Sequence, residues 1–226
     1  MKYLELLGET LTPDGTVLKL MRRDREYIIF ANGKSLMSSG MSGSEQALAM
    51  LTCPRVRKLE SPCVLIGGLG MGFTLRATLD LLPPDAIIVV TELVPAVVEW
   101  NRRPLGPLAE HPLKDRRVRI EICDVAVTLK ASRDKFDAVL LDVDNGPTAM
   151  TTSGNDWLYG DRGIAAAFDA LKRDGVLAVW SAREDRKFEK RLRYGGFAVK
   201  AEPVRGRLKM GGPHHTIFLG QKTSAR

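Results

Sequence analysis

The sequence has few aromatic residues and no long apolar run. Phenylalanine, tryptophan and tyrosine make up only 6% of the chain, too few for a surface on which nucleic-acid bases would stack. No uninterrupted apolar stretch approaches the roughly 18–20 residues that a bilayer-spanning helix needs. The N-terminal segment MKYLELLGET is too acidic, and its apolar part too short, for a secretory signal. We therefore expect a cytoplasmic protein without a membrane partner.

Cysteine is also scarce, and its three copies form no CxxC pair. Cys63 and Cys123 adjoin apolar runs that indicate strands, where a thiol behaves as a small hydrophobic side chain. We expect a structural role for these two and for Cys53. His214 and His215 follow a Gly-Gly-Pro turn, but no further ligands stand at a suitable spacing for a metal. The sequence therefore predicts no metal site.

An excess of one charge is present but not concentrated. The 34 basic and 27 acidic residues give a formal net charge of +7, which permits attraction to nucleic acid or an acidic substrate. The basic residues are spread over the whole chain, and the local clusters at 22–25, 114–117 and 183–193 are interrupted by acids. We interpret them as a solvated surface, and nucleic acid is not an expected partner.

What the sequence does contain is enough apolar residues, 44% of 226, for one sizeable α/β domain with a small appendage. Asn32-Gly33 between apolar segments at 26–31 and 34–38 predicts a type I′ hairpin. Ser44 is a candidate cap for a short helix that reaches about Leu51. We expect residues 1–57 to form a small N-terminal β module with a linking helix, and residues 58–226 to form the main domain.

From Cys63 onward, strand and helix candidates alternate. The strand candidates are short, continuous and rich in β-branched residues, as in strands covered on both faces. They span 64–66, 86–90, 118–122, 138–141 and 176–180, followed by 197–204 and 215–219. Helix candidates span 74–82, 95–101, 125–132 and 162–173, with Gly175 as a C-terminal stop. This order predicts an α/β fold with a doubly wound, mostly parallel sheet that ends in an antiparallel hairpin.

A glycine-rich loop follows the first of these strands. It contains Gly67, Gly68, Gly70 and Gly72. Alternating glycines let the backbone turn tightly and approach a ligand, and a helix that starts near Thr74 presents free N–H groups. A dinucleotide-binding fingerprint would need a glycine where Phe73 stands. The spacing instead suits a ligand made of a nucleoside and an amino acid, and a plain turn is the alternative.

Acidic residues follow the next strands, and in such a sheet the ligand lies beyond the carboxyl ends of the strands. Glu92 stands 20 positions after Gly72, a spacing that suits a carboxylate accepting hydrogen bonds from ribose hydroxyls. An exposed acid at a strand end is the alternative. Asp124 could accept a hydrogen bond from an adenine amine while Val125 packs on the ring, and it could also cap the following helix.

The fourth strand ends in two acids, Asp142 and Asp144, where the reacting end of the ligand is expected. Neighbouring carboxyl groups can raise the pKa of one of them and create a general base, or they can hold an ammonium group. The composition Asp-Asn-Gly-Pro is also typical of a turn. Trp157 and Tyr159 either wall an acceptor pocket here or pack in the core.

These motifs resemble the class I S-adenosylmethionine-dependent methyltransferase superfamily, and most closely its spermidine synthase (aminopropyltransferase) branch. The likeness runs from about Lys58 to Leu219. It rests on VLIGG at 64–68, TELVPAVV at 91–98, RIEICD at 119–124, KFDAVLLD at 135–142, Gly146-Pro147, and Leu158-Tyr159 leading to GVLAV at 175–179. The N-terminal hairpin also resembles the small β module of that branch.

The resemblance implies a Rossmann-like sheet of seven strands whose last strand is antiparallel. It implies that S-adenosylmethionine or its decarboxylated form binds as co-substrate, without a metal. Its contacts would be Glu92 and Leu93 at the ribose, Asp124 and Val125 at the adenine, and the loop of Gly67, Gly68, Gly70 and Gly72 with Asp142 at the tail. Asp144 matches the catalytic aspartate of the branch and Asp142 the acid before it. A small amine, such as a polyamine, would be the acceptor, and a homodimer is a further expectation.

Two segments depart from the branch. Leu69-Gly70-Met71 contains no acid where the branch carries an aspartate for the amine of the decarboxylated co-substrate, and Ser44-Glu45-Gln46 stands where the branch has Tyr-His-Glu. Two alternatives to aminopropyl transfer therefore stay open. One is a methyltransferase acting on a small molecule, since no motif for methylation of nucleic-acid bases follows strand four. The other is a non-catalytic nucleoside-binding relative.

Overall fold

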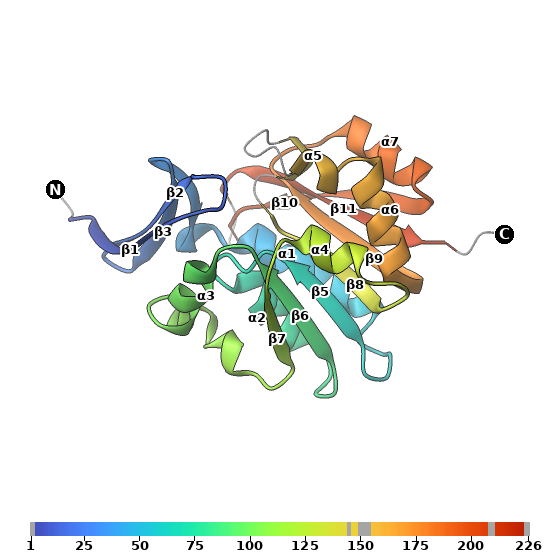
Figure 1. Cartoon of the computed structure of the whole chain (residues 1–226), viewed down its shortest axis with the longest axis horizontal. Coiled ribbons are helices and arrows are strands. Elements are labelled where there is room, and N and C mark those ends of the chain that lie inside the picture. The colour runs from blue at the N-terminus through green and yellow to red at the C-terminus, as the bar shows by residue number, and fades with distance from the viewer. Residues whose placement is uncertain (1–2, 144–145, 149–154, 208–210, 224–226) are drawn as a thin grey trace.

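The computed structural model describes residues 3–143, 146–148, 155–207 and 211–223. It contains a four-stranded antiparallel sheet near the N-terminus and a seven-stranded sheet with helices on both faces. The small sheet lies at one end of the molecule, beside α3 (Pro95–Arg102) (Figure 1). A Cβ atom on Gly8 of the small sheet would stand 2.4 Å from Nε1 of Trp100 in α3, so the two parts are in close contact.

The small sheet is larger than the predicted hairpin. Its strands run in chain order, β1 (Glu5–Leu11), β2 (Val17–Arg23), β3 (Glu26–Ala31) and β4 (Lys34–Ser38). Asn32 and Gly33 between β3 and β4 have φ of 47° and 77°, as a type I′ turn requires, so the hairpin is confirmed. β1 and β2 were not predicted, because only Leu18 and Leu20 of these two strands are buried and the apolar patterning is weak.

The predicted linking helix is present as α1 (Gly43–Thr52), between the short 3-10 turns η1 (Ser39–Met41) and η2 (Cys53–Arg55). Ser44 is not its cap, because the helix already begins at Gly43 and Ser44 is buried in the first turn. The capping position is held by Ser42, whose hydroxyl accepts a hydrogen bond from the side-chain amide of Gln46. α1 packs against α2 (Phe73–Leu81) and against the large sheet. The division of the chain into residues 1–57 and 58–226 stays a prediction.

The large sheet has the predicted doubly wound topology. Its strands are β5 (Cys63–Gly67), β6 (Ile87–Glu92), β7 (Val118–Ile122), β8 (Phe136–Leu141), β9 (Leu171–Ser181), β10 (Phe197–Arg205) and β11 (His214–Lys222). Their spatial order is β10-β11-β9-β8-β5-β6-β7. The first five are mutually parallel, and β11 is antiparallel to both of its neighbours. The sheet therefore confirms the seven-stranded, Rossmann-like prediction.

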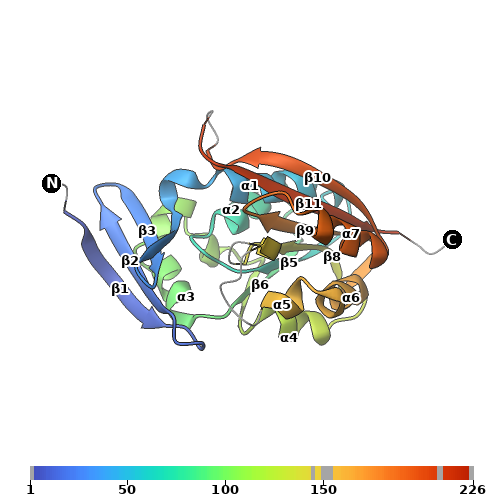
Figure 2. The same ribbon diagram turned by 90° about the horizontal axis from the view of Figure 1, so that it is seen from above.

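Helices cover both faces of this sheet. After α2 and α3, the described elements are η3 (Gly106–Ala109), η4 (Pro112–Lys114), α4 (Val125–Lys130), η5 (Gly146–Thr148), α5 (Asn155–Leu158), α6 (Asp161–Ala170) and α7 (Arg186–Tyr194). α1 and α2 lie on one face, and α4 and α6 lie on the other (Figure 2). The core divides in the same way, since Val64 and Ile66 of β5 belong to one apolar cluster and Leu65 to the other.

Two predictions near the C-terminal half were wrong. α6 ends at Ala170 rather than Arg173, because Leu171 already pairs with Phe136 of β8 and begins β9. Gly175 is therefore inside β9, where the register against β8 shifts, and does not stop a helix. α7 was not predicted, because its sequence is strongly charged and only Phe188 and Leu192 are buried.

Two further expectations concern membranes and thiols. In the described ranges, no helix has both the length and the apolar character needed to cross a bilayer. All three cysteines are free thiols. Cys53 is fully buried in the core, and this burial raises the pKa of its thiol to about 12. Cys53 therefore behaves as a small apolar side chain, as expected.

Candidate functional site

The carboxyl ends of β5, β6, β7 and β8 meet along one edge of the large sheet. Gly67 at the end of β5 pairs with Thr91 of β6 on one side and with Leu141 of β8 on the other. Glu92 in turn pairs with Ile122 of β7. This register brings the glycine loop, Glu92, Asp124 and Asp142 to neighbouring positions at one edge, as the sequence predicts.

The glycine loop adopts a conformation that other residues would enter only with strain. Gly68, Gly70 and Gly72 have φ of 87°, 53° and 83°, in the left-handed region. A Cβ atom on Gly68 would stand 2.6 Å from the carbonyl oxygen of Asp142, and one on Gly72 would stand 2.9 Å from Oδ1 of Asn101. The loop is therefore pressed against the end of β8 and against α3, which a plain turn does not require.

The protein's own hydrogen bonds hold this loop in place. Oε2 of Glu92 accepts from the Leu69 N–H at 3.0 Å, and Oε1 accepts from the Val94 N–H at 2.9 Å. Asn101 donates to the Gly70 carbonyl at 2.8 Å. Burial raises the pKa of Glu92, against the backbone N–H groups that lower it. A carboxylate oxygen has a second lone pair, so Glu92 can still accept from a ribose hydroxyl.

The end of β7 offers a polar group beside apolar surface. Asp124 caps α4, and its Oδ1 accepts from the Ala126 N–H at 2.8 Å. Val125 is buried, and a Cβ atom on Gly67 would stand 3.0 Å from its Cγ2. Leu93 and Ile122 are 45% and 55% exposed at the same edge. The sequence reasoning passed over Ile122, although a large apolar residue next to Asp124 was visible as the last residue of a predicted strand.

Asp142, at the end of β8, is half-buried and held by two hydrogen bonds. Its backbone N–H donates to the Gly67 carbonyl at 2.9 Å, and its Oδ2 accepts from Oγ1 of Thr74 at 2.7 Å. Burial raises the pKa of the Asp142 carboxyl, and the Thr74 hydrogen bond partly opposes this shift. Asp144, the predicted catalytic residue, is outside the described residues.

The two aromatic residues after this strand have different surroundings. Tyr159 is buried and packs edge-on against Phe188, so it belongs to the core. Its hydroxyl donates to the Val143 carbonyl at 3.0 Å and so holds the segment that follows β8. Trp157 is partly exposed, and Nζ of Lys130 lies 3.9 Å from the centroid of its indole ring. Tyr159 is therefore a core residue, whereas Trp157 lies partly at the surface.

Glu45 of α1 is a functional candidate that sequence reasoning missed. Its backbone carbonyl lies 3.4 Å from Oγ1 of Thr74, the hydroxyl that donates to Asp142. Burial, and next the negative charge of Asp142, raise the pKa of the Glu45 carboxyl strongly. In sequence, Glu45 stood out only as part of the segment Ser44-Glu45-Gln46, which departs from the Tyr-His-Glu of the branch. The packing of α1 on α2 brings it to the site.

Trp180 near the end of β9 and His215 near the start of β11 also carry polar atoms without a hydrogen-bond partner among the described residues. The Trp180 and His215 rings are 4.7 Å apart between centroids, and within the described residues neither Nε1 of Trp180 nor Nδ1 of His215 has a hydrogen-bond partner. Burial and the neighbouring His214 lower the pKa of His215. The backbone of Trp180 lies close to Gly146, because a Cβ atom added to Gly146 would stand 2.5 Å from the Trp180 carbonyl oxygen. In the described ranges, no group of three metal-ligating side chains is present.

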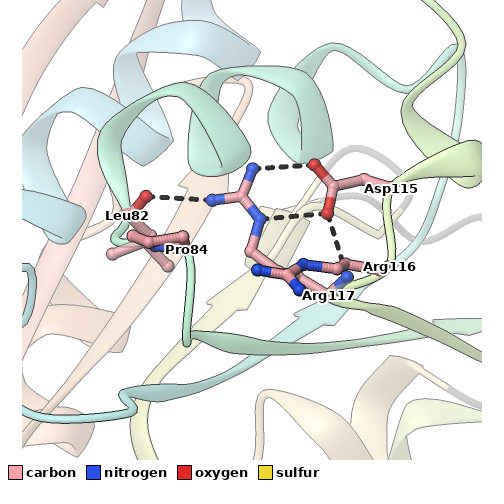
Figure 3. A pocket seen from close by; sticks show the side chains of 5 residues that line it. All are labelled: Leu82, Pro84, Asp115, Arg116 and Arg117. Carbon is pink, nitrogen blue, oxygen red and sulfur yellow. Dashed lines mark hydrogen bonds and ion pairs between the residues drawn. The ribbon is translucent and has the colours of Figure 1, made fainter.

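A separate surface hollow of about 430 Å³ lies near the starts of β6 and β7, away from these carboxyl ends. Its lining residues are Leu82, Pro84, Asp115, Arg116 and Arg117 (Figure 3). Arg117 donates to both carboxylate oxygens of Asp115 and to the Leu82 carbonyl. This pairing lowers the pKa of Asp115 to about 2. The guanidinium of Arg117 thus links the segment before β6 to the segment before β7. We therefore assign the hollow a structural role.

One curated protein is similar in sequence over about half of this chain. A curated polyamine aminopropyltransferase from Ruegeria sp. (strain TM1040) is 30% identical over 118 residues, which are 51% of this chain and 39% of the relative. The chain thus aligns with about two fifths of the length of that relative. Because the alignment covers less than half of the relative, it does not show that this chain has the relative's activity.

Solved structures match over nearly the whole chain. A spermidine synthase in complex with the transition state analogue AdoDATO aligns with a TM-score of 0.72 and 18% identity, covering 96% of this chain and 72% of that one. The spermidine synthase from Thermotoga maritima gives a TM-score of 0.72 and 17% identity, with the same coverage. These likenesses show a shared fold. The model of the spermine/spermidine synthase domain matches residues 48–192, more than half of the sequence, and the chain therefore belongs to that family.

Proposed function

We propose that this protein transfers an aminopropyl group from decarboxylated S-adenosylmethionine to a small amine acceptor such as a polyamine. The observation that carries this proposal is Asp142, whose backbone carbonyl lies against the glycine loop and whose carboxyl group, with a raised pKa, accepts from Thr74 at the start of α2. Both reactants are cations, one a sulfonium and the other an ammonium. A desolvated carboxylate beside the nucleoside loop suits cations and would repel an acidic substrate.

The nucleoside part of the co-substrate would lie across the ends of β5, β6 and β7. Glu92 would accept from the ribose hydroxyls, and Leu93 would lie beside the ribose. Asp124 would accept from the adenine amine, with Val125 packing on the ring. The loop containing Gly67, Gly68, Gly70 and Gly72 leaves room for the backbone to approach the tail. Membership of the synthase family supports these assignments.

The transfer itself is a displacement at carbon. The lone pair of the acceptor nitrogen forms the new N–C bond, the C–S bond breaks, and its electrons neutralise the sulfonium as methylthioadenosine leaves. An acceptor that arrives as an ammonium must first lose a proton. We propose Asp144 as the group that accepts this proton and Asp142 as the neighbour that orients the reacting groups.

The Asp144→Asn variant tests this role. Turnover is measured as methylthioadenosine released from the decarboxylated co-substrate with 1,4-diaminobutane, and co-substrate binding is measured by calorimetry. We expect turnover to be abolished while the dissociation constant of the co-substrate stays within about threefold, because the asparagine keeps the shape and loses the base. Asp169→Asn, at an exposed position on α6, is the matched control. Retained turnover in Asp144→Asn contradicts the proposed role.

One observation favours a second candidate, methyl transfer from ordinary S-adenosylmethionine to a small molecule. The loop side chains Leu69 and Met71 are apolar and buried, so the loop itself offers no carboxylate to a cationic tail. Calorimetric titration with both forms of the co-substrate separates the two functions. Tighter binding of the decarboxylated form supports aminopropyl transfer, and tighter binding of the ordinary form supports methyl transfer. Binding of neither form contradicts the nucleoside site.

A further inference from the structure

A second surface hollow, of about 310 Å³, lies on the part of the large sheet formed by β9, β10 and β11. Its floor lies on one face of the sheet. Gln221 of β11 pairs with Ala198 of β10 and with Val176 of β9, and cross-strand partners point to the same face. Leu219 and Lys200 form the next pair on this face. The residues that line this hollow are distinct from those of the candidate site.

The helix on this face covers only part of it. α1 packs on β9, β10 and β11, and as a helix of 10 residues it is about 15 Å long. The strands β10 and β11 have 9 residues each and extend about 30 Å. After α1 the chain continues into η2, whose last residue, Arg55, lines the hollow. The hollow therefore lies where the sheet continues beyond the end of α1 and η2.

Basic side chains from three different elements line this hollow, which we call the basic hollow. They are Arg55 of η2, Arg193 of α7 and Lys200 of β10. Arg193 reaches the free edge of the sheet, where its Nη2 donates to the Val199 carbonyl at 3.2 Å. Of the described residues that line the hollow, none is acidic. The basic hollow therefore concentrates positive charge, in a chain whose formal net charge is +7.

The internal partners of these three cations leave them able to bind a ligand. Arg55 forms no ion pair or side-chain hydrogen bond in the described part of the chain. Arg193 pairs with Glu189, and Lys200 pairs with Glu202, both outside the lining. The side chains of Arg193 and Lys200 are 54% and 70% exposed, and ion pairs of such exposed groups contribute little free energy. A multiply charged anion can therefore engage all three groups.

The floor between the cations is apolar. Val176 and Leu219 are buried to 1% and 4% exposure, and Ala198 lies beside them. A volume of about 310 Å³ is at the lower end of those that hold small organic ligands. Inorganic phosphate would leave this floor uncovered, whereas a phosphate ester with an apolar or planar part would use both the cations and the floor.

We propose that the basic hollow binds a small organic phosphate of the nucleotide type. Arg55, Arg193 and Lys200 bind the phosphate oxygens, and the organic part of the ligand lies on the floor. Guanidinium groups suit this role, because their planar N–H fork matches two phosphate oxygens. The inference goes beyond the proposed function, since it concerns a second ligand at residues outside the candidate site.

Calorimetric titration of the whole chain with uridine triphosphate tests the site. Methylthioadenosine is present in excess, so that the probe does not occupy the nucleoside site. Uridine, which lacks the phosphates, and inorganic tripolyphosphate, which lacks the organic part, are the comparison probes. We expect uridine triphosphate to bind at least about tenfold more tightly than either. Broadening of its phosphorus NMR signals on addition of protein reports the contact at the phosphates.

Two variants and a matched control locate the binding. Arg55→Gln removes an exposed cation that has no internal partner to disturb, and we expect it to weaken uridine triphosphate at least about tenfold. Lys200→Gln removes a second cation of the hollow and should act in the same direction. Arg57→Gln is the control, because Arg57 is exposed in the same segment but does not line the hollow. Thermal unfolding of each variant confirms that the compared proteins are folded.

Three outcomes overturn the proposal. In the first, uridine triphosphate does not bind at a concentration of about 1 mM. In the second, Arg55→Gln and Arg57→Gln weaken it equally, which indicates diffuse attraction to surface charge. In the third, tripolyphosphate binds as tightly as uridine triphosphate, so the apolar floor takes no part. Failure of the proposed function differs from all three, because it is measured as product formed from the co-substrate and an amine.

Discussion

The candidate site has a proposed nucleoside half, the glycine loop with Glu92 and Asn101, and a proposed acceptor half around Glu45, Asp142, Trp180 and His215. The two halves differ in how far the protein satisfies its own polar groups. In the nucleoside half, both oxygens of Glu92 accept backbone N–H groups, and the amide of Asn101 donates to the glycine loop, leaving only its Oδ1 unpaired. In the acceptor half, Oε2 of Glu45, Nε1 of Trp180 and Nδ1 of His215 lack partners among the described residues. The first half is preformed, and the second has polar atoms for a ligand to meet.

This difference follows from what each half would bind. A nucleoside is recognised largely by shape and by a few fixed hydrogen bonds, so a rigid loop lowers the entropy cost of binding it. A reacting cation is best recognised by desolvated groups whose strongest partner is the ligand itself. We infer that specificity lies in the acceptor half and that affinity for the nucleoside lies in the glycine loop.

The largest expected effect comes from breaking the nucleoside half at Gly68. Gly68→Ala forces a left-handed φ on alanine and places Cβ 2.6 Å from the Asp142 carbonyl oxygen. We expect the variant to lose on the order of 2–3 kcal/mol of unfolding free energy and about a hundredfold in methylthioadenosine affinity. Chemical denaturation and calorimetry measure the two.

Gly15→Ala is the control for Gly68, since Gly15 has a similar φ of 84° and open space around its Cβ position. This control measures the cost of a left-handed φ on alanine, about 1 kcal/mol, without the steric clash that Cβ would make at Gly68. Wild-type nucleoside affinity in Gly68→Ala would show that the loop does not need its close contact with β8.

Glu92→Gln gives the next largest effect. One oxygen of Glu92 becomes an amide NH₂, which faces the backbone N–H of Leu69 or Val94 as a second donor. We expect a loss of about 1–3 kcal/mol in unfolding free energy and at least tenfold in nucleoside affinity. Glu99→Gln, in an exposed ion pair on α3, should change both by little. Equal effects in the two variants would refute the special position of Glu92.

Both halves should contribute to the pH dependence of stability, because burial raises the pKa of Glu92 as well as the pKa values of Glu45 and Asp142. The folded pKa values of Glu45 and Asp142 are raised above their ordinary range near 4. Their contribution to stability is thus complete below about pH 4 and is lost as pH rises through the folded pKa values. Wild-type unfolding free energy should fall with rising pH by up to about 1.4 kcal/mol per unit for each group.

Glu45→Gln sharpens this comparison, because it removes one of these two titrating groups, each of which has a raised pKa. Its unfolding free energy should fall less between about pH 4 and pH 8 than that of the wild type. Chemical denaturation across this range measures both slopes. Parallel curves would mean that Glu45 is not held as a buried acid.

The smallest effect is expected at the surface hollow. Arg117→Lys removes the planar guanidinium group that hydrogen-bonds to both Asp115 and the Leu82 carbonyl. We expect a loss of about 1 kcal/mol in unfolding free energy. Ligand binding should not change, because the hollow is remote from the strand ends. A change in nucleoside affinity above about threefold would show that this region affects the site.

Local chemistry made much of the fold predictable. The Asn32-Gly33 turn, the alternating glycines and the continuous apolar strands each depend on neighbours in sequence. The missed elements have the opposite character. β1 and β2 have little apolar patterning, α7 buries only Phe188 and Leu192, and the end of α6 is set by the pairing of Leu171 with Phe136.

The candidate site divides in the same way. The sequence by itself determined the glycine loop and the acids Glu92, Asp124 and Asp142, because parallel strands bring their carboxyl ends to one edge whatever the details of packing. Only the tertiary structure decided that Glu45 and Asp142 share Thr74 as a neighbour, since α1 must pack on α2 before this can happen. It also decided that these carboxyl groups are desolvated. Burial depends on the whole fold, and no short stretch of sequence records it.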